Sequence, residues 1–263
     1  VQLHDLKIPN QKVPMHTKEE RARLQKAFGY TYEDLKTSIL PMALNGSESI
    51  GAMGIDTPLA VLSNKHQPLF NYFKQLFAQV TNPPIDSIRE KVVTSTTVYL
   101  GTDGNVLEEK AENCKQLKIN DPILTNTDLL KIKNMKVDGF KVETIPIIYY
   151  KNTSLEKAID HLFVEVDRAH REGANIIILS DRGVDENHVA IPSLLAVSAL
   201  QQYLVQTKKR TAMAVILESG EPRDVHHFAT LLGYGASAIN PYLAQESIQE
   251  LIDLNMLDKD YYA

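Results

Sequence analysis

Cysteine, positive charge and long apolar runs are all scarce in this chain. The 263 residues include a single cysteine, Cys114, so no intrachain disulfide can form. No apolar run approaches the roughly 18 residues of a membrane-spanning helix. Lys and Arg number 28 against 33 Asp and Glu, a net charge of −5, and no basic stripe follows the chain. We therefore expect neither nucleic acid nor membrane as a partner, and the lone cysteine favours a reducing compartment, which we take to be the cytoplasm.

The remaining composition is that of a globular protein. Hydrophobic residues make up 43% and charged residues 23% of the chain, and this length can bury a large core. The chain begins with valine, and residues 7–14 are polar and contain prolines. We expect residues 1–16 to be a linker, residues 17–263 to be a single α/β domain, and the whole to be a piece of a longer protein.

The first third of the chain is predicted to be helical, over residues 17–90. Thr17 and Glu20 form a capping-box pattern before a helix at residues 21–28. A second helix is expected at residues 32–44, where Asn45-Gly46 would end it. A third, with an aromatic face, is expected at residues 69–80, before two prolines that cannot continue it.

The pattern becomes regular after residue 140. A strand at residues 96–100 and short pieces of uncertain type at 106–139 come before it. Strands are expected at 140–150, 175–179, 211–217 and 236–239, and helices at 154–172, 192–206, 225–232 and 241–254. Asn240 would cap the last helix, with Pro241 at its first position.

These βα repeats, within residues 140–255, predict a parallel sheet with both faces covered. Half of a (β/α)8 barrel and a doubly wound sheet are both compatible with them. The preceding strands could supply the rest of a barrel. We expect an α/β fold, a degenerate or incomplete (β/α)8-like barrel, with an extra helical N-terminal region.

Functional groups of such folds lie at the carboxyl ends of the strands. The stretch 218–242 combines acids, an arginine, glycines and adjacent histidines there. A metal site could bring together Asp181, His188, Glu218, His226 and His227. However, neighbours on a helix point about 100° apart, and no recognised ligand spacing is present. We therefore expect no metal.

Cofactor binding and acid–base chemistry have equally weak signals. Pro241 has no N–H for a phosphate, and no glycine-rich nucleotide fingerprint follows a strand. Glu218 and Glu221 could work as an acid–base pair, with Arg182 or Arg223 beside them. Acids at residues 221–224 would also stabilise a helix start, and we favour that interpretation. We expect no catalytic and no cofactor-binding residue.

Four blocks of this chain resemble the central domain of the glutamate synthase large subunit. They are MALNGSE at 42–48 with GAMGIDTPLAVLS at 51–63, YFKQLFAQVTNPPIDSIRE at 72–90, ILSDR at 178–182 with IPSLLA at 191–196, and ESGEPRDVHHFATLLGYGASAINPYLA at 218–244. They span most of the chain in the order expected for the family. The second and fourth blocks are long and specific.

The resemblance implies a part in reductive glutamate synthesis from glutamine and 2-oxoglutarate. In that family an N-terminal amidotransferase domain releases ammonia, and a later barrel domain carries FMN and an iron–sulfur cluster. The central domain joins the two in one polypeptide, resembles a degenerate FMN barrel without flavin, and helps to wall an ammonia tunnel. We therefore expect an enzyme component, itself non-catalytic, whose partners are these two domains.

The resemblance also implies where the tunnel or the domain interface would lie. The candidate residues are Thr81, Asn82, Pro83, Pro84, Ile85, Met53 and Asp56. A rigid Pro-Pro turn beside Thr and Asn could offer ammonia polar contacts without trapping it. The chain departs from the family at Ala52, where serine is usual, at Ile55, where an acid or asparagine is usual, and around residues 201–202, where a histidine is often found. These departures weaken the transfer of individual residue roles.

Two other functions compete with this one. An autonomous βα-barrel enzyme, such as a metal-dependent hydrolase or lyase, would use Asp181, Glu218 and His226. A pure binding module for a separate chain would present an exposed apolar face in residues 40–90, with Ile50, Met53 and Ile55.

Overall fold

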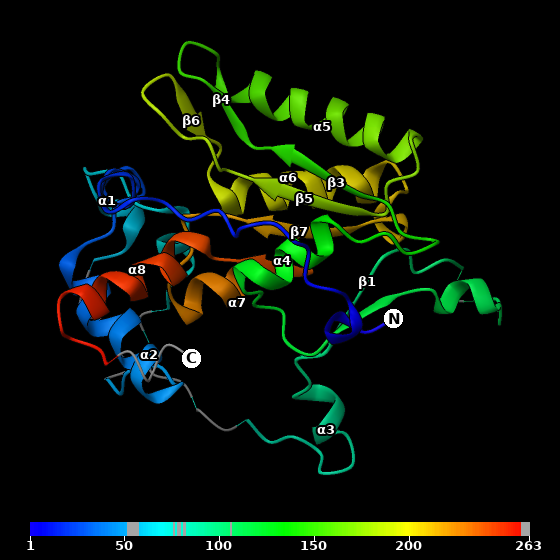
Figure 1. The fold of residues 1–263 in the computed structure, drawn as a ribbon, viewed down its shortest axis with the longest axis horizontal. Coiled ribbons are helices and arrows are strands. Elements are labelled where there is room, and N and C mark those ends of the chain that lie inside the picture. Colours follow the sequence, from blue (N-terminus) through cyan, green and yellow to red (C-terminus); the bar gives the residue numbers. More distant parts are fainter. Residues whose placement is uncertain (52–57, 76, 78–79, 81–82, 106, 259–263) are drawn as a thin grey trace.

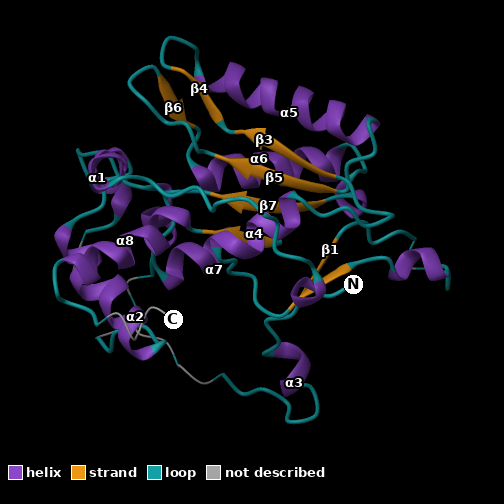
Figure 2. Ribbon diagram, viewed as in Figure 1, coloured by secondary structure: helices purple, strands orange, loops and turns teal. Residues whose placement is uncertain are grey.

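The computed structural model describes residues 1–51, 58–75, 77, 80, 83–105 and 107–258. Its centre is a parallel sheet of four strands in the order β3-β5-β7-β8, and Figure 2 shows β3, β5 and β7 side by side. The strands are β3 (Val142–Pro146), β5 (Ile176–Ser180), β7 (Ala214–Glu218) and β8 (Ala238–Asn240). Beyond β8, Ile123 forms a parallel bridge with Ile239. The predicted parallel sheet is confirmed.

Both faces of this sheet are buried, as the apolar strands predict. Ile177 and Leu179 of β5 belong to a core with helices α5 (Leu155–Arg171), α6 (Ser193–Gln206) and α7 (Val225–Gly233). Ile176 and Ile178 belong to a second core on the opposite face. Helix α4 (Asn126–Lys133) and the antiparallel pair β1 (Val98–Leu100) and β2 (Leu117–Ile119) complete that core.

The expected strand at residues 140–150 is divided in two. β3 ends at Pro146, and β4 (Ile148–Tyr150) pairs antiparallel with β6 (His188–Ala190) in a separate ribbon. Ile147 makes the transition, because its N–H donates to Ser180 O and its carbonyl accepts from Ile191 N–H. The prediction of one continuous strand was wrong, because the chain leaves the sheet at a proline.

No ladder within the described ranges joins β3 to the opposite edge of the sheet. The fold is therefore mixed α/β with a four-stranded parallel sheet and helices. Among the same residues, no helix has the length and apolar character needed to cross a membrane.

The first predicted helix is confirmed as α1 (Lys18–Ala27), with a complete capping box between Thr17 and Glu20. The second is a π-helix, η2 (Asp34–Ile39), that continues as α2 (Leu40–Asn45). Gly46 ends it at φ 62°, a left-handed conformation that suits glycine. Helix α8 (Tyr242–Asp253) packs against η2 through Leu251 and Ile252.

The aromatic helix predicted at residues 69–80 is wrong. Among the residues of this range that the structure describes, the regular element is a 3₁₀ turn, η4 (Leu69–Phe73), and Lys74 after it is extended with ψ 133°. Phe70 is buried, but Phe73 and Phe77 are 45% and 79% exposed. A short amphipathic helix is unstable without a surface for its apolar face. Part of the predicted range lies outside the described residues.

Short elements complete the chain. They are η1 (Leu3–Asp5), η3 (Ala60–Leu62), α3 (Glu90–Val93), η5 (Ala111–Cys114) and η6 (Arg210–Ala212). Near the amino terminus, Leu3 and Leu6 pack on the second core, and Gln2 bridges to Lys118. Figure 1 shows α3 at the end of a segment that extends away from the sheet.

Candidate functional site

Buried polar side chains gather at the carboxyl edge of the sheet. Ser180 at the end of β5 is in register with Glu218 at the end of β7, and Glu218 with Asn240 at the end of β8. These three residues, and Asp181 and Ser219 that follow the strands, are buried. Open α/β sheets bind their ligands at this edge, so the candidate site belongs here.

Glu218 is held between two cations. Its Oε1 lies 2.6 Å from Arg182 Nε and its Oε2 lies 2.7 Å from Lys133 Nζ, and the side chain is only 2% exposed. Burial alone would raise the pKa of Glu218, but Lys133 and Arg182 outweigh it and lower that pKa. Both oxygens are occupied, so Glu218 is an ionised structural group rather than a base open to a substrate.

Asp181 holds the loop after β7. Its Oδ2 accepts from Ser219 Oγ at 2.5 Å, and both carboxyl oxygens lie 3.1 Å from the Gly220 N–H. Burial raises the pKa of Asp181 to about 7, against the opposing effect of the hydrogen bonds from Ser219, Tyr242 and Gly220. The carboxyl group therefore ties the β5 and β7 loops together.

Arg182 extends the cluster to helix α8. Its guanidinium carbon lies 4.0 Å from the centre of the Tyr242 ring, and its Nη1 lies 3.8 Å from Glu246 Oε1. Glu246 is 1% exposed, and its Oε2 lies 2.9 Å from Nδ1 of His16 and accepts the His16 backbone N–H at 3.2 Å. The segment before α1 thus reaches the carboxyl edge of the sheet.

The end of α1 also lies on this edge. A Cβ placed on Gly220 would be 2.7 Å from the Phe28 ring, so only glycine fits there. Tyr30 Oη donates to Gly220 O at 2.9 Å. Arg223 donates to the Phe28 and Gly29 carbonyls at 3.1 and 2.9 Å. The position that a ligand would take is covered by the protein itself.

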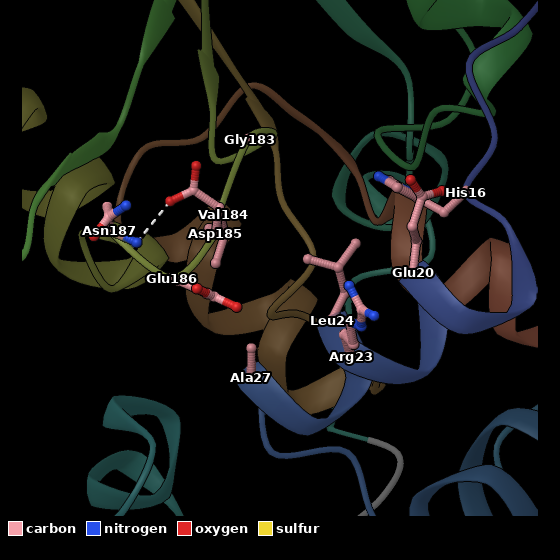
Figure 3. A pocket seen from close by; sticks show the side chains of 10 residues that line it. All are labelled: His16, Glu20, Arg23, Leu24, Ala27, Gly183, Val184, Asp185, Glu186 and Asn187. Atoms are coloured by element: carbon pink, nitrogen blue, oxygen red, sulfur yellow. Dashed lines mark hydrogen bonds between the residues drawn. The ribbon is translucent and has the colours of Figure 1, made fainter.

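A groove of about 740 Å³ separates α1 from the loop at residues 183–187. Figure 3 shows the side chains of the two elements facing it from opposite sides. Asp185 in this loop accepts the backbone N–H groups of Asn187 and His188 at 2.7 and 2.8 Å, and its carboxylate also meets the His188 ring at 3.0 Å. These bonds stabilise the turn into β6.

The two adjacent histidines both contact Phe70, one at its backbone and the other at its ring. His226 Nε2 lies 2.8 Å from Phe70 O. His227 stacks on the Phe70 ring at 4.2 Å and accepts the Arg223 N–H through Nδ1 at 3.3 Å. Burial lowers the pKa of His227 to about 4. In the part of the chain that the structure describes, no three His, Cys, Asp or Glu side chains are grouped to hold a metal.

Asp181, Glu218 and His226, the trio of an autonomous enzyme, take different partners. The two carboxylates follow neighbouring strands, but the bonds recorded for His226 lead to Phe70 and, through its carbonyl, to Thr230. Among the described residues, no hydrogen bond or ion pair joins this histidine to either acid. The arrangement does not favour that function.

The acids of residues 221–224 act at helix starts. Asp224 caps α7 through the His227 N–H at 2.9 Å, which confirms the structural interpretation. Glu221 instead caps α6, because its Oε2 accepts from the Ser193 N–H and Oγ at 2.8 and 2.6 Å.

The sequence interpretation of Asn240 was wrong by one residue. Asn240 ends β8, and α8 begins after Pro241 with no side-chain cap. Asn240 Nδ2 instead donates to Leu124 O and Asn126 Oδ1, both at 3.0 Å. The amide therefore ties β8 to the start of α4.

Three members of the cluster were not predicted from the sequence: Lys133, Glu246 and His16. Lys133 lies in the part of the chain where no regular pattern is visible, and His16 lies in the segment predicted to be a linker. Glu246 carried one signal, because it stands four residues after Tyr242 on the buried face of a helix, where an acid needs a partner.

The predicted tunnel residues fall only partly within the structure. Met53, Asp56, Thr81 and Asn82 lie outside the described residues. Pro83, Pro84 and Ile85 are exposed and lie in the loop that leads to α3.

The fold and the site define an α/β domain with a parallel sheet whose carboxyl edge is filled by its own charged side chains and by α1. Residues 23–262 match the family described as glutamate synthase central domain. The chain belongs to this family.

Curated relatives agree with this assignment. The chain is 47% identical to the glutamate synthase [NADPH] large chain of Bacillus subtilis over 237 residues, which are 90% of this chain and 16% of the relative. It is 44% identical to a ferredoxin-dependent glutamate synthase 2 of Synechocystis over 230 residues, 86% of this chain and 15% of the relative. It is 44% identical to the glutamate synthase [NADH] of Schizosaccharomyces pombe over 236 residues, 88% of this chain and 11% of the relative. The chain thus spans less than a fifth of these relatives.

Proposed function

We propose that this chain is the connecting domain of a glutamate synthase that makes glutamate reductively from glutamine and 2-oxoglutarate in the cytoplasm. Residues 1–16 are a linker and residues 17–263 one domain, descended from a barrel. Its partners are an amidotransferase domain before it and an FMN domain after it in the same polypeptide. FMN and the iron–sulfur cluster belong to that neighbour, and the connecting domain has no catalytic, cofactor or metal residue of its own.

The main support is the occupied carboxyl edge. Glu218 uses both oxygens on Lys133 and Arg182, and Asp181 uses both on Ser219 and Gly220. An active site instead keeps a group free to meet its substrate. A parallel sheet with this edge filled is consistent with a barrel relative that has a structural role.

The proposed tunnel wall comprises Thr81, Asn82, Pro83, Pro84 and Ile85, with Met53 and Asp56. The segment that follows these residues exposes apolar side chains among charged ones, with Ile88 at 88% and Val92 at 79%. Apolar groups exposed together mark a surface that another protein surface covers. This supports a domain interface next to residues 81–85.

A flavin titration tests the connecting role. We expect purified chain mixed with FMN to return colourless protein after gel filtration, and to hydrolyse no glutamine. Stoichiometric yellow flavin retained by the chain would overturn the proposal.

The tunnel role needs the whole enzyme. An Ile85→Trp variant of the full-length protein should hydrolyse more glutamine than it uses to make glutamate from 2-oxoglutarate, because ammonia is lost on the way. Val164→Trp, at an exposed position on α5, is the matched control. An unchanged ratio of glutamine hydrolysed to glutamate formed in Ile85→Trp would exclude this position from the tunnel.

A further inference from the structure

We infer that residues 16–30, here called the strap, form a lid that opens and closes over the carboxyl edge of the sheet as one unit. The strap comprises His16, the cap Thr17, helix α1 and the turn to Tyr30. Opening would uncover Arg182, Tyr242 and Glu246 without unfolding the sheet. This inference concerns motion within the domain and does not depend on the connecting role.

The strap is docked mainly by polar bonds. Gln25 Nε2 donates to Ser247 Oγ at 2.9 Å and to Glu250 Oε2 at 2.7 Å. Arg21 Nη2 lies 3.5 Å from Asp253 Oδ2. Both Arg21 and Gln25 are buried against α8. Polar bonds of this kind are exchanged for bonds to water when a segment opens, so their net contribution to docking is small.

The strap buries less apolar surface than the helices that cover the sheet, and its apolar contacts are made by Leu24 and by the rings of Phe28 and Tyr30 against Tyr242 and Leu243. Leu24 is the single apolar side chain that α1 buries, at 9% exposure. Helix α6, by contrast, buries Leu194, Val197, Leu200 and Leu204 in the core of the sheet. Segments with few buried apolar contacts open at a lower free energy than the core does. The strap can therefore open while the sheet remains folded.

The two ends of the strap allow movement as a unit. At the first end, His16 reaches the sheet edge through Glu246, and the chain before it has no regular structure from residue 6 to residue 16. At the other end, Gly29 turns the chain at φ 68°. Beyond that turn, Leu35 and Ile39 of η2 are buried against α8, so η2 forms a fixed anchor.

The surface under the strap has the features of a ligand position. The Phe28 ring packs on Gly220 so closely that a Cβ would lie within 2.7 Å of it. Glu246 Oε1 is buried and accepts no hydrogen bond within the described part of the chain. A buried acceptor without a donor is costly. Water entering on opening would supply that donor, which favours a strap that moves.

Amide hydrogen exchange, read by mass spectrometry on the 263-residue chain, tests the strap. We expect peptides from residues 18–30 to exchange roughly tenfold or more faster than peptides from β5 and β7. Raising the salt concentration should speed their exchange, because ion pairs are screened, and leave β5 unchanged. Equal rates for the strap and the sheet would overturn the inference.

A variant tests the coupling between the strap and the edge. Gln25→Ala should speed exchange in residues 18–30 roughly fivefold through the loss of two hydrogen bonds. Exchange of the Gly220 amide, whose N–H donates to Asp181 beneath the strap, should become faster as well. The exchange rates of residues 176–179 should stay unchanged. Lys26→Ala, on the exposed side of the same helix, is the control and should change neither. Faster exchange in α1 with an unchanged Gly220 amide would show that the helix frays without uncovering the edge, and would reject the lid.

Discussion

Two regions of this molecule use apolar side chains in opposite ways. In residues 140–258 the apolar strands are fully covered, and Ile176, Ile177, Ile178 and Leu179 have no exposed surface. In residues 50–93, Ile50, Phe77, Ile88 and Val92 are all largely exposed. Both regions contain apolar patterns, but within the described chain only the first is covered along its length, whereas Phe70 is the buried exception in the second. The difference teaches that a pattern predicts a buried face only where another element is available to cover it.

The largest test of this contrast is a matched pair of truncations. Leu217→Ala in β7 should lower the free energy of unfolding by about 3 kcal/mol, because it leaves a cavity in the core that β7 shares with α6 and α7. Val92→Ala in α3 should change it by less than about 0.5 kcal/mol. Urea unfolding of both variants measures the difference. Comparable losses would mean that α3 packs within this domain.

The buried ion pairs give the next effect. Arg182→Met leaves Glu218 buried with Lys133 alone, and should cost about 2 kcal/mol in urea unfolding at pH 7. Arg168→Met removes an exposed arginine that pairs with Glu165 and Glu172, and should cost less than about 1 kcal/mol. If the two substitutions cost the same, the carboxyl edge is no more tightly held than the surface.

The same ion pairs predict an acid dependence. Because the folded state lowers the pKa of Glu218, its contribution is present above the ordinary value of 4.5 and is lost as the pH falls through the folded value. Arg182→Met should therefore lose less stability than the wild type on acidification.

Asp181 predicts a pH dependence of opposite sign. Its folded pKa of about 7 lies above the ordinary 3.8, so the folded state binds the extra proton between those values. The stabilisation that comes from this proton is present at low pH. As the pH rises from 5 to 7, the free energy of unfolding should therefore fall by about 2 kcal/mol. Asp181→Asn should flatten that slope in unfolding measured across this range, whereas Asp160→Asn, at an exposed position, should keep it. If Asp181→Asn leaves the slope of unfolding free energy against pH unchanged, the Asp181 carboxyl group is not the cause of that slope.

The smallest effect separates the strap from the sheet. Thr17→Ala removes the cap of α1, and Thr125→Ala removes the cap of α4, each worth about 1 kcal/mol. The α4 change should appear in global unfolding, because α4 packs on the sheet. The α1 change should appear in hydrogen exchange of residues 18–30 and leave global unfolding nearly unchanged. If both substitutions lower the global free energy of unfolding equally, the strap and the sheet unfold together as one cooperative unit.

Local rules were sufficient for much of the fold. The capping box at Thr17, the helix that became α5 and the continuous apolar strands were all predicted from short stretches. The separation of His226 from His227 followed from helix geometry alone. The predicted helix at residues 69–80 failed because its stability depends on a partner surface, which no local pattern contains.

The candidate site divides in the same way. Its position at the strand ends, with Asp181 and Glu218, follows from the topology of a parallel sheet. Its partners do not, because Lys133, His16 and Glu246 come from segments 85, 202 and 28 positions away from Glu218 in the chain. Their meeting is decided by the way α4, α1 and α8 pack around the sheet.

The sequence by itself determined the family, the parallel sheet and the edge at which its polar groups gather, because these depend on local patterns and on strand order. Tertiary structure alone decided that this edge is filled: one carboxylate is neutralised by two cations, and a polar helix lies across the glycine loop. The physical reason is that a buried charge is stable only when distant parts of the chain bring it a partner, and the distance along the sequence conceals which parts those are.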